Sequence, residues 1–398
     1  MSFNWSNAAE VAIVTGLGEI PVVGSILGGL VEIFWPESPV DVWAEIKSKV
    51  EALVGQAIST NNYDIVQEQL GGLSDLVNNY LDSVKNDEDA HDNWDSANAQ
   101  FIVTRKSCQG IDVGDEILLL PLFAQMANMH LSLLRDGILK GYCDEDAFND
   151  ALNEYTGWVD LTLPKGVSQR AQTNPNSFNY QNDFARFMQL NVGNSRALWP
   201  YFDPIAYPPP VKNLPVSAEV FYTITEAVGP SFSSDDYVLP SSPPVGSVTA
   251  VNVFCLQNSS ENYNVVEGAQ VNYTSGSAPY YGVLVNGAPP PNGGTNPTNS
   301  YYSYYTQTIG VNPGDPVAKI QGQYDTGGGT YGISLVTKSG AASPITPAQA
   351  SQSYVAAFTI TSPEGYSLSS IWAPAKWSWY NAVRDMVFGF RMDPSNLG

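Results

Sequence analysis

The stretch Ile117-Leu-Leu-Leu-Pro-Leu-Phe-Ala-Gln-Met-Ala-Asn-Met-His-Leu-Ser-Leu-Leu134 is apolar on nearly every side when it is wound as a helix. A helix of that kind lies in the core of a large domain or spans a membrane. Continued to Lys140, it has about 24 residues and a length of roughly 36 Å, which is enough to cross a bilayer. We expect it at the centre of a bundle of amphipathic helices. Its polar residues then need buried partners: Gln125, Asn128, His130 and Ser132.

The sequence on either side has the spacing that such a bundle requires. Apolar residues recur every three and four positions, which is typical of amphipathic helices. The expected helices cover residues 40–58, 63–84, 87–104, 145–163 and 177–198. The apolar segment 11–35 has no basic flank and is broken by Glu19, Pro21 and Glu32. It therefore fits a buried helical hairpin better than a signal peptide or a membrane span.

Composition changes sharply after Trp199. The prolines at 200, 204 and 208–210 cannot continue a helix, because each lacks an amide donor and restricts its predecessor. Short alternating runs then follow at 247–256, 301–309, 317–324, 331–337 and 356–361. We expect a helical domain over residues 1–203 and an all-β domain over residues 204–398, built as a sandwich, barrel or prism.

Charge and residue types exclude several classes of function. The net charge is −22, from 39 acidic and 17 basic residues. Such a surface repels nucleic acid and gains nothing from anionic lipids, so contact with a membrane has to rest on burial or on a receptor. Cys108, Cys143 and Cys255 form no paired framework and are interpreted as free thiols. The two histidines sit in no metal-ligand array and no catalytic motif occurs, so we expect no enzyme, cofactor or metal.

Several motifs carry a family resemblance. The run Pro121-Leu-Phe-Ala-Gln-Met-Ala-Asn-Met-His-Leu-Ser-Leu-Leu-Arg-Asp136 resembles the central helix of the three-domain crystal (Cry) δ-endotoxins of insect-pathogenic bacilli. Ile20-Pro-Val-Val-Gly24 resembles their opening helices, and Ala197-Leu-Trp-Pro-Tyr-Phe-Asp203 resembles their last bundle helix and linker. Ala218-Glu-Val-Phe-Tyr-Thr223 is similar to the first strand of their second domain. The matches stand in family order and cover most of the chain.

The resemblance implies a fold and a mechanism. The first half is expected to be a seven-helix bundle around a central hydrophobic helix, which inserts a helical hairpin into a membrane. The second half is expected to be a β-prism whose apical loops bind receptors. The chain is expected to end where the family's third domain would begin.

The expected roles fall on particular residues of the bundle. The residues expected on the membrane-inserting central helix are Leu119, Leu122, Phe123, Met126, Asn128, His130, Leu133 and Leu134. The residues expected to face a pore are Asp92, Asp95 and Asn98. The plainer alternatives are that the helix is only the core of a large domain, and that the acidic residues form a solvated surface.

In the β half, loop-like stretches rich in Tyr and Asn are expected to contact a receptor or a sugar. The candidates are Tyr280, Tyr281, Asn292, Asn296, Tyr301, Tyr302, Tyr304 and Tyr305. The alternative is that Gly, Pro and Asn turn the chain while the tyrosines line a sheet.

The leading hypothesis is a pore-forming insecticidal toxin, monomeric in solution and oligomeric in its pore. Its partners would be the membrane of gut epithelial cells and a protein or glycan receptor on it. We expect no signal peptide, storage as an inclusion or crystal or release, and action outside the producing cell on the host plasma membrane. The second hypothesis is a non-toxic lectin-like binding or storage protein, and the third is a glycan-processing enzyme.

Overall fold

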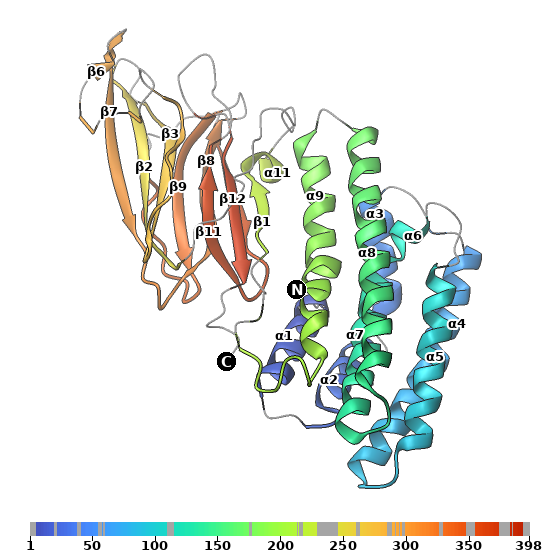
Figure 1. Cartoon of the computed structure of the whole chain (residues 1–398). Coiled ribbons are helices and arrows are strands. Elements are labelled where there is room, and N and C mark those ends of the chain that lie inside the picture. The colour runs from blue at the N-terminus through green and yellow to red at the C-terminus, as the bar shows by residue number, and fades with distance from the viewer. Residues whose placement is uncertain are drawn as a thin grey trace. The chain divides into compact units, whose positions relative to one another are not determined.

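A computed structural model describes residues 5–19, 22–37, 41–54, 58, 60–109, 115–174, 177–212, 214, 218–228, 246–259, 263–284, 289–290, 292–293, 295–296, 299–325, 329–347, 355–373, 383 and 385–392. The chain divides into two compact units (Figure 1). The helical unit contains Met1–Thr173 and Asp183–Ala218, and the β unit contains Asn174–Asn182 and Glu219–Asp393.

The first part of the chain is helical, as expected. The helices are α1 Trp5–Gly18, α2 Ser25–Phe34, α3 Val42–Val54, α4 Thr60–Lys85, α5 His91–Gln109, α6 Asp115–Leu118, α7 Leu120–Lys140, α8 Glu145–Thr173, α9 Phe178–Met188 and α10 Asn194–Leu198. A π-helical turn, Gln189–Gly193, joins α9 to α10, and a 3-10 turn, Trp199–Phe202, follows. The predicted hairpin over 11–35 is confirmed, because α1 and α2 pack against each other.

Three details of the helices differ from the prediction. The described residues contain ten helices before the β strands where seven were expected, partly because two expected helices are interrupted. The central one breaks at Leu119, since Pro121 has no amide hydrogen to donate one turn back and therefore opens α7 as a new helix. The last one is interrupted by the π-helical turn. The predicted end of a helix at residue 163 was wrong, because α8 continues through Pro164 to Thr173.

The β unit is built from three antiparallel sheets. Their strand orders are β1-β12-β11, β10-β8-β9 and β4-β3-β2-β7-β6, with β5 pairing β3. The strands are β1 Val220–Thr223, β2 Val248–Asn258, β3 Tyr263–Tyr273, β4 Gly276–Ser277, β5 Tyr281–Gly282, β6 Thr295–Asn296, β7 Asn299–Gly310, β8 Val317–Asp325, β9 Gly329–Thr337, β10 Val355–Thr361, β11 Tyr366–Trp372 and β12 Val387–Met392; a short helix, α11 Ile224–Val228, follows β1. The five strands expected from alternation are confirmed, and three sheets around a core make the prism.

The core of the β unit is formed by side chains from several sheets. Leu256 and Val265, from β2 and β3, pack with Tyr304 of β7 and Tyr331 of β9. β11, which pairs with β12 at the end of its sheet, is buried along its whole length. Strand β3 was not predicted, because Glu267 and Gly268 interrupt its apolar pattern; both are nonetheless enclosed in the unit.

Candidate functional site

The central helix α7 is the most enclosed element of the helical unit. Every residue from Leu120 to Gly137 is buried. The eight residues expected on this helix are all buried: Leu119, Leu122, Phe123, Met126, Asn128, His130, Leu133 and Leu134. Helices α2, α5 and α8 and the segment from the π-helical turn to Phe202 pack around it. The predicted central position is therefore confirmed.

In the structure, α7 is shorter than the helix expected from the sequence, and its last turns carry charged side chains. α7 contains 21 residues, and Arg135, Asp136 and Lys140 lie in its last turns. Across the residues described, none of the helices combines the length and the apolar content that crossing a membrane requires.

A row of buried hydrogen bonds along α7, here called the polar ladder, provides partners for the polar side chains in the middle of the helix. Asn128 Nδ2 donates to Gln125 Oε1 at 2.8 Å and to Ser195 Oγ at 3.1 Å. Asn128 Oδ1 accepts from Trp199 Nε1 at 2.7 Å. Gln125 Nε2 donates to the carbonyl oxygen of Asn191 at 3.0 Å. The ladder thus joins α7 to the segment from the π-helical turn to Phe202.

His130 joins three helices. Its Nδ1 lies 2.8 Å from the Tyr155 hydroxyl of α8, and its Nε2 lies 2.8 Å from Asn98 Oδ1 of α5. Because a carboxamide oxygen only accepts, Nε2 carries the proton and Nδ1 accepts from Tyr155. Phe101 stacks on the ring, with centroids 4.8 Å apart. Burial, and to a smaller extent the charge of Arg105, lower the pKa of His130 to about 3, so the ring stays neutral.

An ion pair lies beside this histidine. Arg105 Nη2 of α5 is 2.5 Å from Glu154 Oε2 of α8, and the guanidinium lies 5.5 Å from the Tyr155 ring centroid. The Arg105 side chain is 7% exposed and that of Glu154 is 53% exposed. The pair therefore closes the α5–α8 contact at the surface of the bundle.

The expected pore-facing residues divide into two groups. Asp92 and Asp95 lie on the exposed side of α5, and Asp95 is 3.8 Å from His91. Asn98 is half-buried in the closed bundle, where its carboxamide oxygen is bound to His130, and its exposure to a pore stays a prediction.

Most of the tyrosines proposed for receptor contact lie in strands of the β unit. Tyr301, Tyr302, Tyr304 and Tyr305 lie in strand β7, and Tyr304 is only 3% exposed in the core. The expectation that Tyr304 is available for contact was therefore wrong, since alternation along the strand turns it inward. Tyr301 is 58% exposed. Tyr302 and Tyr305 are half-buried.

The other receptor candidates are also partly engaged. The Tyr280 hydroxyl donates to the carbonyl oxygens of Glu267 and Val283. Tyr281 stacks on Trp372, with centroids 5.5 Å apart. Asn292 is exposed, although its Oδ1 accepts from the Thr306 amide. The Asn296 side chain lies outside the described residues.

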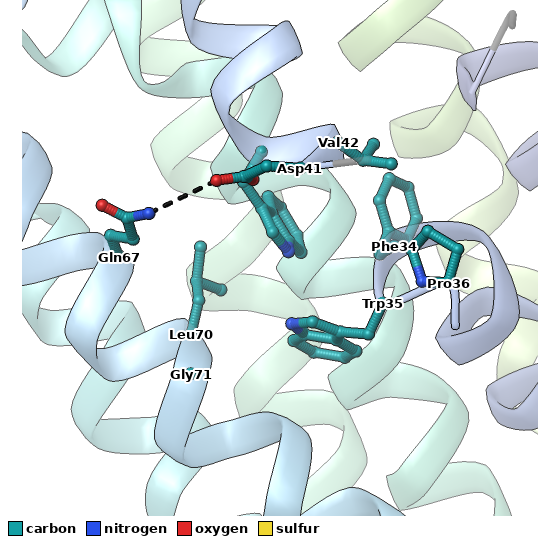
Figure 2. A pocket seen from close by; sticks show the side chains of 9 residues that line it. Phe34, Trp35, Pro36, Asp41, Val42, Gln67, Leu70 and Gly71 are labelled. Carbon is teal, nitrogen blue, oxygen red and sulfur yellow. Dashed lines mark hydrogen bonds between the residues drawn. The ribbon is translucent and has the colours of Figure 1, made fainter. Parts of the chain in front are cut away.

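A pocket of about 300 Å³ lies where α2, α3 and α4 meet (Figure 2). Its lining residues are Phe34, Trp35, Pro36, Asp41, Val42, Trp43, Gln67, Leu70 and Gly71. Trp43 contacts Trp35 and stacks on Phe34, with centroids 5.7 and 5.1 Å away. Asp41 accepts from the Ala44 amide at 3.0 Å and from Gln67 Nε2 at 3.4 Å. The aromatic rings and the carboxylate are therefore engaged within the protein.

Comparison with known proteins identifies the family. The family model described as the delta endotoxin N-terminal domain matches residues 12–203, which span the ladder and its partners. The chain belongs to the δ-endotoxin family. The pesticidal crystal protein Cry12Aa of Bacillus thuringiensis is 26% identical to this δ-endotoxin over 213 residues, which cover 50% of this chain and 17% of Cry12Aa. The δ-endotoxin thus spans a small part of that relative's length.

Solved structures share the fold of both units. The mosquito-larvicidal Cry4Aa toxin of Bacillus thuringiensis superposes with a TM-score of 0.77 at 15% identity, covering 97% of this chain and 73% of that one. The structure of PirB superposes with a TM-score of 0.71 at 13% identity, covering 99% of this δ-endotoxin and 97% of PirB. At these identities the likeness concerns the fold alone.

Several residues of the ladder were not foreseen from the sequence. Tyr155, Ser195 and Trp199 complete the hydrogen bonds of α7, but they lie 25 to 71 positions away in the chain. The sequence indicated that His130 and Asn128 need hydrogen-bond partners, but no spacing in the sequence identified which residues these partners are.

Proposed function

We propose that this δ-endotoxin is a pore-forming insecticidal toxin that permeabilises gut epithelial cells. The observation that carries the proposal is the complete enclosure of α7 by other helices, since a bundle that opens would expose the apolar side chains of this helix to lipid. Backbone groups stay satisfied within a helix, so insertion requires no refolding of that segment. The names of Cry12Aa, a pesticidal protein, and Cry4Aa, a larvicidal toxin, support the same activity.

The inserting element would be the hairpin of α5 and α7. Two contacts tie these helices to each other and would survive insertion: Trp94 Nε1 donates to the Leu133 carbonyl at 2.8 Å, and His130 bonds Asn98. Other bonds would have to break, because they lead to parts of the bundle that stay behind. Among them are the bonds of His130 to Tyr155, of Asn128 to Ser195 and Trp199, and of Arg105 to Glu154.

The remaining roles follow from this hairpin. One hairpin cannot line a pore, so several copies would assemble in the membrane, with Asp92 and Asp95 facing the lumen and favouring cations. The β unit would bind the receptor, protein or glycan, and Tyr301 and Asn292 are its most accessible candidates. We expect the toxin to act outside the cell that makes it, on the plasma membrane of the host.

The test is a reversible lock on the hairpin. Asn62 Nδ2 of α4 lies 2.8 Å from Asp115 Oδ2 at the start of α6, which leads into α7. The double variant Asn62→Cys/Asp115→Cys places two thiols at this contact, and mass spectrometry checks that oxidation has formed the disulfide tying α6 to α4 before dye release is measured. Dye release is measured from vesicles of gut brush-border membrane, with and without protease pretreatment. The matched control is Asp315→Cys/Ser339→Cys, a hydrogen-bonded pair within the β unit.

We expect the oxidised Asn62→Cys/Asp115→Cys variant to bind the vesicles without releasing dye, and a reductant to restore release. The control variant should release dye whether oxidised or reduced. Full release by the oxidised lock would exclude insertion of this hairpin. Binding by the wild-type protein without release under any condition would instead favour the lectin-like hypothesis.

A further inference from the structure

Two carboxyl groups are buried at the N-terminal hairpin α1–α2, and the proposed function assigns no role to either of them. Glu10 lies in the middle of α1 and is 4% exposed. Asp136 lies near the end of α7 and is 3% exposed. A carboxyl group in such surroundings costs free energy when it ionises, unless donors or cations compensate the charge.

Glu10 has little compensation. Its Oε2 accepts from Asn194 Nδ2 of α10 at 3.1 Å, and its buried Oε1 has no hydrogen-bond partner. Burial raises the pKa of Glu10 to about 7, against the opposing effect of the Asn194 hydrogen bond.

The elements packed against α1 carry few charged groups. The Val211 amide donates to the Leu17 carbonyl oxygen at 2.9 Å, and Lys212 beside it is exposed. On α2 the titratable residue is Glu32, which is exposed. The π-helical turn has none, and on α10 the charged residue is Arg196, which forms a two-pronged pair with Asp160 of α8. None of these side chains contributes to the shift in the pKa of Glu10.

Asp136 provides an internal comparison. Burial also raises its pKa to about 7, yet its ionised form is compensated by several groups. Its Oδ2 accepts from the Gly24 amide at 2.9 Å and from the Tyr80 hydroxyl at 3.4 Å. The charges of Arg135 and Lys140 favour ionisation as well. The two pKa values are raised to about the same level, so the difference lies in what detachment does. Glu10 leaves with α1 and becomes hydrated, whereas Asp136 stays on α7 and would lose the Gly24 amide donor if α2 left.

We propose that Glu10 is a pH-sensitive element that controls the docking of α1: the helix packs firmly on the bundle while this carboxyl is protonated and detaches when it ionises. Detachment is confined to α1, because the bond from the Gly24 amide to Asp136 holds the start of α2 in either state. Gly24 has a φ of 82°, which suits glycine at this turn.

The direction of the pH dependence follows from linkage. In detached α1, Glu10 has its ordinary pKa of 4.5, while in docked α1 the pKa is raised to about 7. Docking is therefore strongest at pH 4.5 and below, weakens as the pH rises to about 7, and stays weak above that. Each unit of pKa difference is a factor of ten, so the opening equilibrium of α1 increases by up to about 300-fold.

Hydrogen exchange of the full chain, read by mass spectrometry between pH 5 and 9 and corrected for the intrinsic rate, measures this opening. Peptides from Trp5–Gly18 should lose protection progressively between pH 5 and about 7 and change no further above that, while peptides from Ser25–Phe34 should stay protected throughout. Glu10→Gln should keep α1 protected throughout. Glu32→Gln, the matched control at an exposed site of α2, should behave as the wild type.

Unchanged protection of α1 in the wild type between pH 5 and 8 would overturn the proposal, and so would a wild-type profile in Glu10→Gln. If Glu10→Gln does not fold, the variant Asp136→Asn tests the proposal instead. This variant should keep the pH-dependent loss of protection in α1. Loss of that pH dependence would show that Asp136, and not Glu10, causes the effect. No membrane is involved, so this result and that of the dye-release test are independent.

Discussion

Replacing Asn128 by leucine tests whether the polar ladder stabilises the closed bundle. Asn128 is fully buried and bonds three side chains, from Gln125, Ser195 and Trp199. The change leaves the Trp199 indole N–H without an acceptor in a buried site, which costs about 1–3 kcal/mol. The Gln125 oxygen also loses its donor, whereas the Ser195 hydroxyl can rotate to another acceptor. We expect Asn128→Leu to lower the free energy of unfolding by about 3 kcal/mol.

Urea denaturation followed by far-ultraviolet circular dichroism measures this loss, because the signal reports mainly on the helical unit. The matched control is Asn78→Leu, at an exposed site of α4, which should change stability by less than about 0.5 kcal/mol. The double variant Asn128→Leu/Trp199→Phe removes donor and acceptor together. It should cost at least about 1 kcal/mol less than the sum of its single changes. A cost below about 1 kcal/mol for Asn128→Leu, or strict additivity in the double variant, would refute the reasoning.

Three further variants test other contacts by the same denaturation assay. A Cβ at Gly137 would lie 2.6 Å from Trp94 Cζ2 and 2.8 Å from Cys143 Sγ, so Gly137→Ala should lower the free energy of unfolding by about 1–3 kcal/mol. The control Gly157→Ala, at an open site of α8, should be neutral or stabilising. Equal effects of the two changes would contradict this packing. Glu154→Gln should cost less than about 1 kcal/mol, because water screens this half-exposed partner of Arg105. Asp136→Asn should reduce the loss of stability between pH 4 and 7, because burial raises the pKa of Asp136 from 3.8 to about 7 and ionisation above the unfolded value then disfavours the folded state. A decline as steep as that of the wild type would show that Asp136 does not titrate in this range.

The sequence predicted the structure best where a pattern of residues is compatible with a single kind of structure. An apolar run from Ile117 to Leu134 can be satisfied in water only by enclosure, and the structure encloses it. Prolines 200, 204 and 208–210 marked the end of the helices for the same kind of reason. The free state of Cys108, Cys143 and Cys255 was also predicted correctly.

Long-range partners were beyond such reasoning. The need of His130 and Asn128 for hydrogen bonds was clear, yet which residues meet it depends on how helices distant in sequence pack together. The sequence did not show that Asn98 of α5 is the partner of His130, because that contact depends on how α5 packs against α7. Tyr304 was assigned to a receptor because tyrosines cluster around it, and the sheet register decided its burial.

The π-helical turn at Gln189–Gly193 affects how this protein is aligned with its relatives. Each residue of an α-helix advances by about 100° around the axis, so one extra residue in a wide turn resets the face that follows it. Without that residue, Ser195 and Trp199 would point away from Asn128. A homologue with a regular helix here needs a gap of one position within 189–193 before its residues are equated with those of the ladder. An ungapped comparison would report these partners as lost where they are merely displaced by one column.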